Sequence, residues 1–326
     1  MMDSLRNLFR IGPGPSSSHT MAPARAARQF HEQCTEALLV RLHLFGSLAA
    51  TGRGHLTDKA AVDALHPLPV KVLFHPEATL PKHPNGMRFE ALNAAGDVYS
   101  SREVYSVGGG ALSDDKESAA DTPRYPVASM ADMLEWSEDS GNPFWKLVAD
   151  VEGEDVWAFL KTVYEAMNAA MVRGLEMEGI LPGGLRLPRR AQQFKRRAMR
   201  LDVGVTRTGR LSAYALAVAE ENAAGGVVAT APTCGSSGVV PAVLRFLREQ
   251  LDASEHEMLQ ALAIAGLVGN VVKHNASISG AEVGCQGEIG TACAMADAAA
   301  AWLLGGSSRH IEYAAGMGLG HHFGLA

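Results

Sequence analysis

The sequence predicts an α+β N-terminal domain over residues 1–125, followed by a mostly α-helical domain over residues 126–326. Three observations lead to this fold class. The length of 326 residues corresponds to about two domains. Strand-like and helix-like patterns alternate through the first 110 residues, and helical patterns dominate from about residue 129 onward.

Turn residues and apolar periodicity define the elements expected in the first domain. Pro23 near the first turn predicts a helix over 22–33, and Pro67 ends a short helix that begins at residue 58. One strand is expected within 36–49 and should end at Gly46, and another is expected over 68–76. Two more strands are expected within 87–110, joined by a turn at Gly96-Asp97. Residues 111–125 are polar and patternless, which predicts a linker or a loop.

The second part of the chain shows helical periodicity separated by glycines and capping residues. Ser129 is expected to cap the first of these helices, and a long amphipathic helix over 154–179 is expected to end at a glycine. Further helices are predicted over 212–226, 239–251, 254–274 and 290–306. Several are rich in Ala and Gly, which favours close packing in a core.

Composition excludes several classes of protein. A hydrophobic content of 47% and a charged content of 20% are typical of a globular chain. The net charge of −6 and the apparent lack of a basic stripe argue against nucleic acid as a partner. The longest apolar stretch, 261–272, is shorter than the roughly 20 residues that span a bilayer. Four irregularly spaced cysteines and the lack of a signal-peptide pattern predict a reducing, cytoplasmic location.

Two stretches of the first domain carry groups suited to chemistry. "GPGPSSSHT" (12–20) places hydroxyls and a histidine before a predicted helix, which suits either an anion such as a carboxylate or phosphate, or simple helix capping. "GRGHLTD" (52–58) places His55 on a glycine-flanked loop, where it could act as a general base or be a surface histidine.

Two stretches of the second domain surround cysteines with small residues. In "ENAAGGVVATAPTCGSSGVVPAVL" (221–244), Cys234 precedes a helix, which suggests an anion cradle with a lowered thiol pKa, or a tight turn and helix cap. In "NASISGAEVGCQGEIGTACAMA" (275–296), small residues around Cys285 let the backbone approach another helix or a bound group. Without a CxxC motif or paired histidines at ligand spacing, a zinc site is not indicated.

These four stretches occur together with "HPNGMRFEA", "YSVGGG" and "GILPGGLRLPRR". In that order, and over nearly the whole chain, they resemble the single-chain iron–sulfur L-serine dehydratases (L-serine ammonia-lyases) of bacteria. The resemblance implies a beta-chain-like N-terminal domain and an alpha-chain-like catalytic domain. It also implies a cytoplasmic homodimer that converts L-serine to pyruvate and ammonia in amino-acid degradation and gluconeogenesis.

The resemblance further implies a cofactor and a set of site residues. The family holds a 4Fe–4S cluster by three cysteines and leaves one iron open as a Lewis acid, without pyridoxal phosphate. Cys285 matches the first cluster ligand, whereas Cys234 and Cys293 match none. His55 matches the favoured candidate base, and His19, in the substrate loop, is the second expected catalytic residue. The positions that match substrate-binding residues are Ser16, Ser17, Ser18, Thr20, Thr233, Gly235, Asn275, Ser277 and Ser279.

The sequence departs from the family pattern at its end. The resemblance places the second cluster cysteine directly after Ala326 and the third further downstream, so one of three ligands is present. We therefore expect the second domain to be C-terminally incomplete. Two other readings are a cluster-free amino-acid-binding or regulatory protein, and one subunit of a split enzyme. Threonine and cysteine derivatives are alternative substrates.

Overall fold

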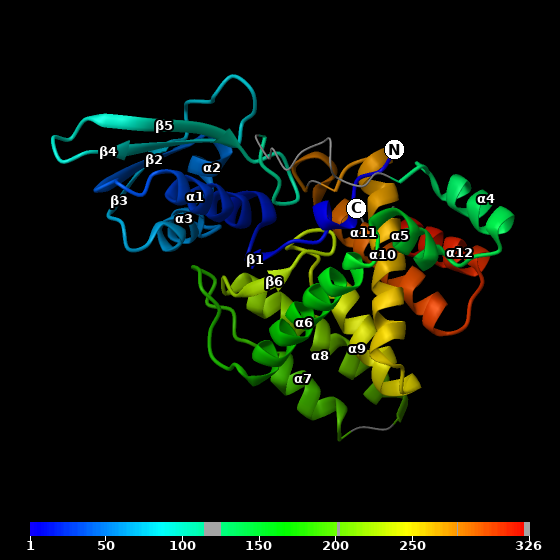
Figure 1. The fold of residues 1–326 in the computed structure, drawn as a ribbon. Coiled ribbons are helices and arrows are strands. Elements are labelled where there is room, and N and C mark those ends of the chain that lie inside the picture. The colour runs from blue at the N-terminus through cyan, green and yellow to red at the C-terminus, as the bar shows by residue number, and fades with distance from the viewer. Residues whose placement is uncertain (114–124, 201–202, 279, 323–326) are drawn as a thin grey trace. The chain divides into compact units, whose positions relative to one another are not determined.

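The chain forms two compact units that differ in secondary structure (Figure 1). The computed structural model describes residues 1–113, 125–200, 203–278 and 280–322, apart from the side chains of 203–205, 281, 282 and 285. The smaller unit consists of residues 13–118, and the larger, helical unit consists of residues 1–12 together with 119–326. The expected fold class, an α+β part followed by a mostly helical part, is confirmed.

The smaller unit is a four-stranded sheet with helices packed on one face (Figure 1). The strand order is β3-β2-β4-β5; β2 and β3 are parallel, and the other neighbours are antiparallel. Phe30, Leu42 and Phe89 are buried between the sheet and the helices. The elements are η2 (Ser17–Met21), α1 (Ala22–Gln33), β2 (Leu39–Phe45), α2 (Gly46–Ala50), α3 (Thr57–Leu65), β3 (Val70–His75), β4 (Gly86–Leu92) and β5 (Val98–Tyr105).

The predicted elements of this unit are confirmed within a few residues, with one difference after β2. The chain turns at Gly46 into the short helix α2, so the strand ends at Phe45. Gly46 has φ +49°, and a Cβ there would lie 2.5 Å from the carbonyl oxygen of Pro84. Only glycine accommodates both the left-handed conformation and this close approach. Most of the patternless stretch 111–125 lies outside the described residues.

The helical unit is built around one helix that is buried on all sides. Residues 258–270 of α10 are all buried, and α10 packs against α5, α6, α9 and α11. A helix that is apolar around its whole circumference belongs in a core. The elements are η1 (Leu5–Asn7), α4 (Met130–Ser140), α5 (Phe144–Glu152), α6 (Asp155–Glu176), α7 (Ala191–Ala198), α8 (Val203–Ala223), β6 (Val227–Ala229), α9 (Val239–Leu251), α10 (Glu255–Asn275), α11 (Gly280–Leu303) and α12 (Ser308–Gly320).

The first residues of the chain belong to this helical core. Met2, Leu5, Leu8 and Phe9 are at most 1% exposed, and β1 (Ile11–Pro13) pairs with β6. Glycines of α10 make room for them: a Cβ at Gly266 would lie 2.9 Å from atoms of both Leu5 and Phe9.

A buried carboxylate anchors the same segment. Glu152 accepts hydrogen bonds from the Ser4 hydroxyl (2.7 Å), the Leu5 amide (2.6 Å) and the Tyr125 hydroxyl (2.8 Å). Three donors on one carboxylate satisfy a charge that would otherwise be costly to bury. The N-terminal segment is therefore fixed both by apolar packing and by these polar contacts.

Several helical boundaries differ from the sequence-based expectation. The expected Ser129 cap is present as a capping box with Asp132. The long helix α6 ends at Glu176 with the extended residue Met177 as its cap, so the expectation of a terminal glycine was wrong. Helix α11 begins at residue 280, ten residues before the predicted start, and a non-helical residue, Gly284 (φ 69°, ψ 175°), interrupts it. The glycines of this segment lower its helix propensity, so the sequence did not predict its first turns. Packing against α10 and α12 compensates for the low propensity.

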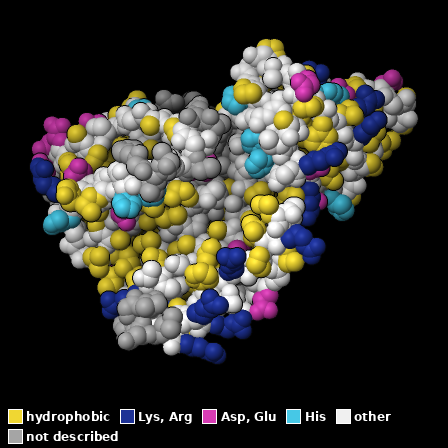
Figure 2. All heavy atoms as spheres, turned by 180° about the vertical axis from the view of Figure 1, so that it is seen from behind, with side chains coloured by type: hydrophobic (Ala, Val, Ile, Leu, Met, Phe, Trp, Pro, Cys, Tyr) yellow, Lys and Arg dark blue, Asp and Glu magenta, His cyan; other side chains and the backbone are white. Residues whose placement is uncertain are grey.

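A local basic surface was not expected. Residues 186–210 include nine Lys and Arg, and Arg196, Arg197 and Arg200 around α7 are exposed. Figure 2 shows basic side chains gathered toward the bottom of the view. The acidic net charge of the chain therefore does not extend to this surface. Among the helices of the described residues, none combines the length and apolar character needed to cross a membrane.

Candidate functional site

In the smaller unit, the hydroxyl-rich stretch before α1 forms the tight π-helical turn η2. Ser16 is its N-cap, and the Ser16 side chain accepts a hydrogen bond from the His19 amide (3.2 Å). The Thr20 hydroxyl accepts one from the Ser16 amide (3.1 Å). Ser17 is buried, whereas Ser18 is half-buried and contacts His19. Ser16 and Thr20 thus stabilise the local turn, as the capping alternative predicted, and the Ser18 hydroxyl contacts both Ser16 and His19.

His19 lies between two serine hydroxyls. Its Nδ1 is 2.9 Å from Ser18 Oγ, and its Nε2 is 2.9 Å from Ser47 Oγ. Burial, followed by the nearby His55, lowers the pKa of His19 to about 4. His19 is therefore neutral near pH 7, so one ring nitrogen donates a hydrogen bond and the other accepts one.

His55 faces His19, and two threonines fix the backbones of both. The Thr20 hydroxyl donates to the His55 carbonyl (2.6 Å), and the Thr57 hydroxyl donates to the His19 carbonyl (2.5 Å). His55 Nδ1 is 3.1 Å from the Thr51 carbonyl oxygen. Because a carbonyl only accepts, Nδ1 carries the proton, and Nε2 of neutral His55 keeps its lone pair. This tautomer is the one that a general base requires.

In the helical unit, the loop before α9 meets a carboxylate from α11. The Thr233 hydroxyl donates a 2.7 Å hydrogen bond to Glu288 Oε2. The next hydroxyl, Ser236, donates to the Ala231 carbonyl (3.0 Å) and so closes the turn. A Cβ at Gly235 would lie 2.7 Å from Glu288 Oε2, so the carboxylate lies directly against the backbone of this loop. The loop around Cys234, which was predicted to bind an anion, therefore contacts the carboxylate of Glu288 from the same unit.

The thiol of this loop is inactive. Cys234 is completely buried, and burial, followed by the charge of Glu288, raises its pKa. The expectation of a lowered thiol pKa was therefore wrong, because no cation offsets the loss of solvation. Cys234 is a small buried hydrophobic residue.

The remaining predicted residues lie around the start of α11. The Asn275 amide donates to the carbonyls of Ala128 (2.7 Å) and Val271 (2.9 Å) and so ends α10. Ser277 is half-buried. Ser279 and the side chain of Cys285 lie outside the described residues, although the backbone of Cys285 belongs to α11.

The described thiols do not supply a ligand set for a metal cluster. Cys293 Sγ is 3.6 Å from His322 Nε2, and burial, followed by Asp297, raises the pKa of this thiol. Within the described part of the chain, no three His, Cys, Asp or Glu side chains are grouped as metal ligands. A 4Fe–4S cluster is normally held by three or four protein ligands. The described residues alone therefore do not fit such a cluster.

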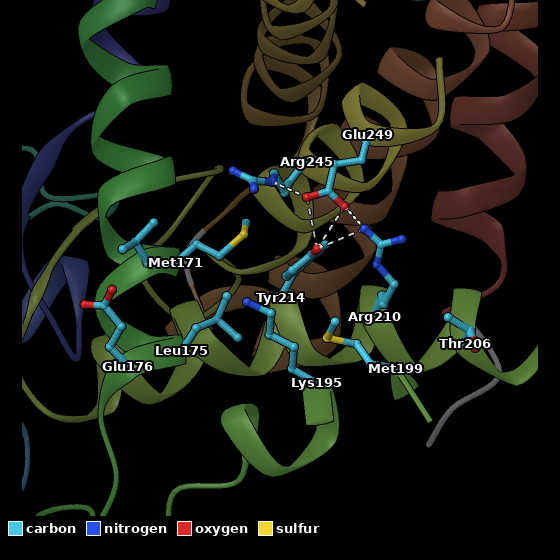
Figure 3. A pocket seen from close by; sticks show the side chains of 11 residues that line it. Met171, Leu175, Glu176, Lys195, Met199, Thr206, Arg210, Tyr214, Arg245 and Glu249 are labelled. Atoms are coloured by element: carbon cyan, nitrogen blue, oxygen red, sulfur yellow. Dashed lines mark hydrogen bonds and ion pairs between the residues drawn. The ribbon is translucent and has the colours of Figure 1, made fainter. Parts of the chain in front are cut away.

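A cavity of the helical unit lies elsewhere. It measures about 660 Å³ and combines apolar side chains with a charged group (Figure 3). Glu249 there accepts hydrogen bonds from Tyr214 (2.9 Å) and Arg245 (2.6 Å), and it also pairs with Arg210. The cavity is lined by Met171, Val172, Leu175, Glu176, Lys195, Met199, Thr206, Arg210, Tyr214, Arg245 and Glu249. None of these was predicted as a site residue, and the polar network around Glu249 is internally satisfied.

Two residues of these arrangements were missed from the sequence. Ser47 contacts His19 Nε2, and Glu288 accepts from Thr233. The signal for Ser47 is its place directly after Gly46, the glycine at which the chain turns after β2. The signal for Glu288 is that it is the acid three residues after Cys285, about one helical turn away.

Comparison with known proteins decides the family. The model of the family described as "Serine dehydratase alpha chain" matches residues 32–326. The chain belongs to this serine dehydratase family. A serine dehydratase named "L-serine dehydratase" from Streptomyces coelicolor is 38% identical over 382 aligned residues, which cover 100% of this chain and 84% of the relative. "L-serine dehydratase 1" from Escherichia coli is 36% identical (99% and 84%), and "L-serine dehydratase" from Mycobacterium bovis is 37% identical (100% and 83%).

Proposed function

We propose that the chain catalyses the deamination of L-serine to pyruvate and ammonia. The observation that carries this proposal is whole-length similarity, at 36–38% identity, to proteins named L-serine dehydratase. The unprotonated Nε2 of His55 is consistent with the chemistry, because β-elimination requires a base for the α-proton. The proposal extends to a cytoplasmic enzyme that acts as a homodimer.

The residues have distinct roles in this proposal. His55 Nε2 accepts the α-proton, and the β-hydroxyl leaves and takes up this proton from His55, which gives water and 2-aminoacrylate. This enamine tautomerises to the imine, and water then releases ammonia and pyruvate. His19, neutral near pH 7, positions Ser18 and Ser47 and is not the proton donor. Substrate binding falls to Ser16, Ser17, Ser18, Thr20, Thr233, Gly235, Asn275, Ser277 and Ser279.

The cofactor is a separate part of the proposal. The resemblance implies a 4Fe–4S cluster, and we propose Cys285 as one of its thiolate ligands. The described residues do not supply the rest of a ligand set, and the roles given to His55 and His19 do not depend on the cluster.

The test is the reaction itself. Chain purified without oxygen is expected to release pyruvate and ammonia in equal amounts from L-serine. Release of 2-oxobutyrate from L-threonine at a higher kcat/KM would assign the other substrate. Tight serine binding without any product would favour an amino-acid-binding protein instead.

A cysteine pair tests the ligand assignment. Cys285→Ser is expected to lower the iron content and the absorbance of iron–thiolate bonds, whereas Cys293→Ser, on the same helix, is expected to leave both unchanged. Equal iron content in wild type and Cys285→Ser would remove Cys285 as a ligand.

A further inference from the structure

Glu288 is a half-buried carboxylate without a cation. Its Oε2 accepts the Thr233 hydroxyl, and among the described residues it forms no ion pair with Lys, Arg or His. Partial removal of a carboxylate from water is unfavourable unless another group compensates the charge. One neutral hydroxyl does so only in part. A cationic group from a ligand would compensate the rest of the charge.

Two glycines fix the place of this carboxylate. A Cβ at Gly235 would lie 2.7 Å from Oε2, and one at Gly280 would lie 2.2 Å from Oε1. The carboxylate is thus held between the backbone of the loop before α9 and the start of α11. An ionised carboxylate offers about four acceptor positions, and Thr233 uses one of them. The others are open to further donors.

We propose that Glu288 binds the α-ammonium group of the amino-acid substrate. This inference rests on the proposed function, because it takes L-serine as the ligand. Of the three polar groups of serine, only the ammonium is cationic, and its three N–H donors match a group that only accepts. Charge-assisted bonds of this kind are about twice as strong as neutral ones. The same charge repels the substrate carboxylate, so Glu288 also orients the amino acid.

The test compares two ligands that differ only at the group in question. L-glycerate has a hydroxyl in place of the ammonium of L-serine and has the same configuration. Dissociation constants for both are measured by calorimetry on the full chain in a His55→Gln background, which suppresses turnover of L-serine, with and without Glu288→Gln. Glutamine keeps the shape and can still accept the Thr233 hydroxyl, but it has no charge. Glu165→Gln, on the exposed surface of α6, is the matched control.

Glu288→Gln is expected to weaken L-serine binding at least tenfold, which corresponds to about 1.4 kcal/mol. L-glycerate binding is expected to change less than threefold, and Glu165→Gln is expected to leave both constants unchanged. An equal loss for both ligands would show that Glu288 merely supports the loop, and unchanged serine binding would also overturn the inference.

Pyruvate release by wild type distinguishes a wrong ammonium assignment from a wrong proposed function. If wild type converts L-serine and Glu288→Gln binds it equally well, the ammonium assignment alone is wrong. If wild type neither binds nor converts L-serine, the proposed function is wrong and this inference falls with it.

Discussion

The imidazole rings of His19 and His55 lie with their centroids 4.8 Å apart and their planes tilted by 37°. At this distance a charge on one ring disfavours a charge on the other. Burial makes His19 the ring that stays neutral, with a pKa lowered to about 4. The neutral state of His19 leaves the proton-accepting role to His55 in the proposed mechanism.

The first prediction concerns stability against pH. His19 has a folded-state pKa of about 4, below the ordinary value of 6.5. Between these values the unfolded chain binds more protons than the folded chain, so the free energy of unfolding rises with pH through this window. This contribution is complete above about pH 6.5 and is lost as the pH falls toward 4. Urea unfolding from pH 4.5 to 7.5 should show a weaker pH dependence for His19→Gln. Parallel curves for the two proteins would contradict the neutral state of His19.

The second prediction concerns the base. His55→Gln removes the lone pair at Nε2, and kcat for pyruvate release should fall about 100-fold or more, the range of general base catalysis. His66→Gln, at an exposed histidine after α3, is the matched control and should retain wild-type turnover. Wild-type kcat in His55→Gln would assign proton removal to another group.

The third prediction concerns the glycine beside Glu288. The methyl group of Gly235→Ala would lie 2.7 Å from Oε2 and would displace the carboxylate. Loss of the Thr233 hydrogen bond should weaken L-serine binding about fivefold, which corresponds to roughly 1 kcal/mol. Gly316→Ala, which meets nothing within 4 Å on the exposed side of α12, should leave binding unchanged. It should also stabilise the chain by about 0.5–1 kcal/mol through helix propensity. Equal serine affinity in the two variants would show that Glu288 adjusts freely.

The fourth prediction concerns the anchor of the N-terminal segment. Glu152→Gln replaces one acceptor oxygen by a donor that faces the Ser4, Leu5 or Tyr125 donors. A buried mismatch of this kind should lower the free energy of unfolding by about 2–4 kcal/mol. The exposed Glu165→Gln should change it by less than about 0.5 kcal/mol. Urea denaturation followed by helical circular dichroism measures both. A change in Glu152→Gln as small as in the control would mean that the segment is held by apolar packing alone.

Sequence patterns predicted the elements that have clear local signals. The helix predicted over 239–251 is α9 with the same limits, because an apolar stripe runs along all of it. Helix α7 was missed because its residues are mostly polar, and it is held by packing against α8. The first residues gave no sign that they would enter a core formed by helices more than 130 residues away. Such long-range packing leaves no local pattern.

The candidate site was predictable to a similar degree. His19 and His55 were selected from their loops, and the structure places their rings together. The contact of Thr233 with Glu288 joins residues 55 positions apart, so no spacing rule predicts it. The pKa of the Cys234 thiol was expected to be lowered, but it is raised. The sequence does not show that this thiol is fully buried beside an anion.

The place of residues 1–12 in the helical unit has a consequence for biosynthesis. The smaller unit occupies residues 13–118, so it is complete as the chain emerges, before any of α4–α12 has been made. Met2, Leu5, Leu8 and Phe9 are synthesised before the smaller unit but are buried only when α10 has followed them. Until α10 has been made, this short apolar segment lacks its packing partner. Residues 1–12 are thus made before the smaller unit but reach their final environment after it.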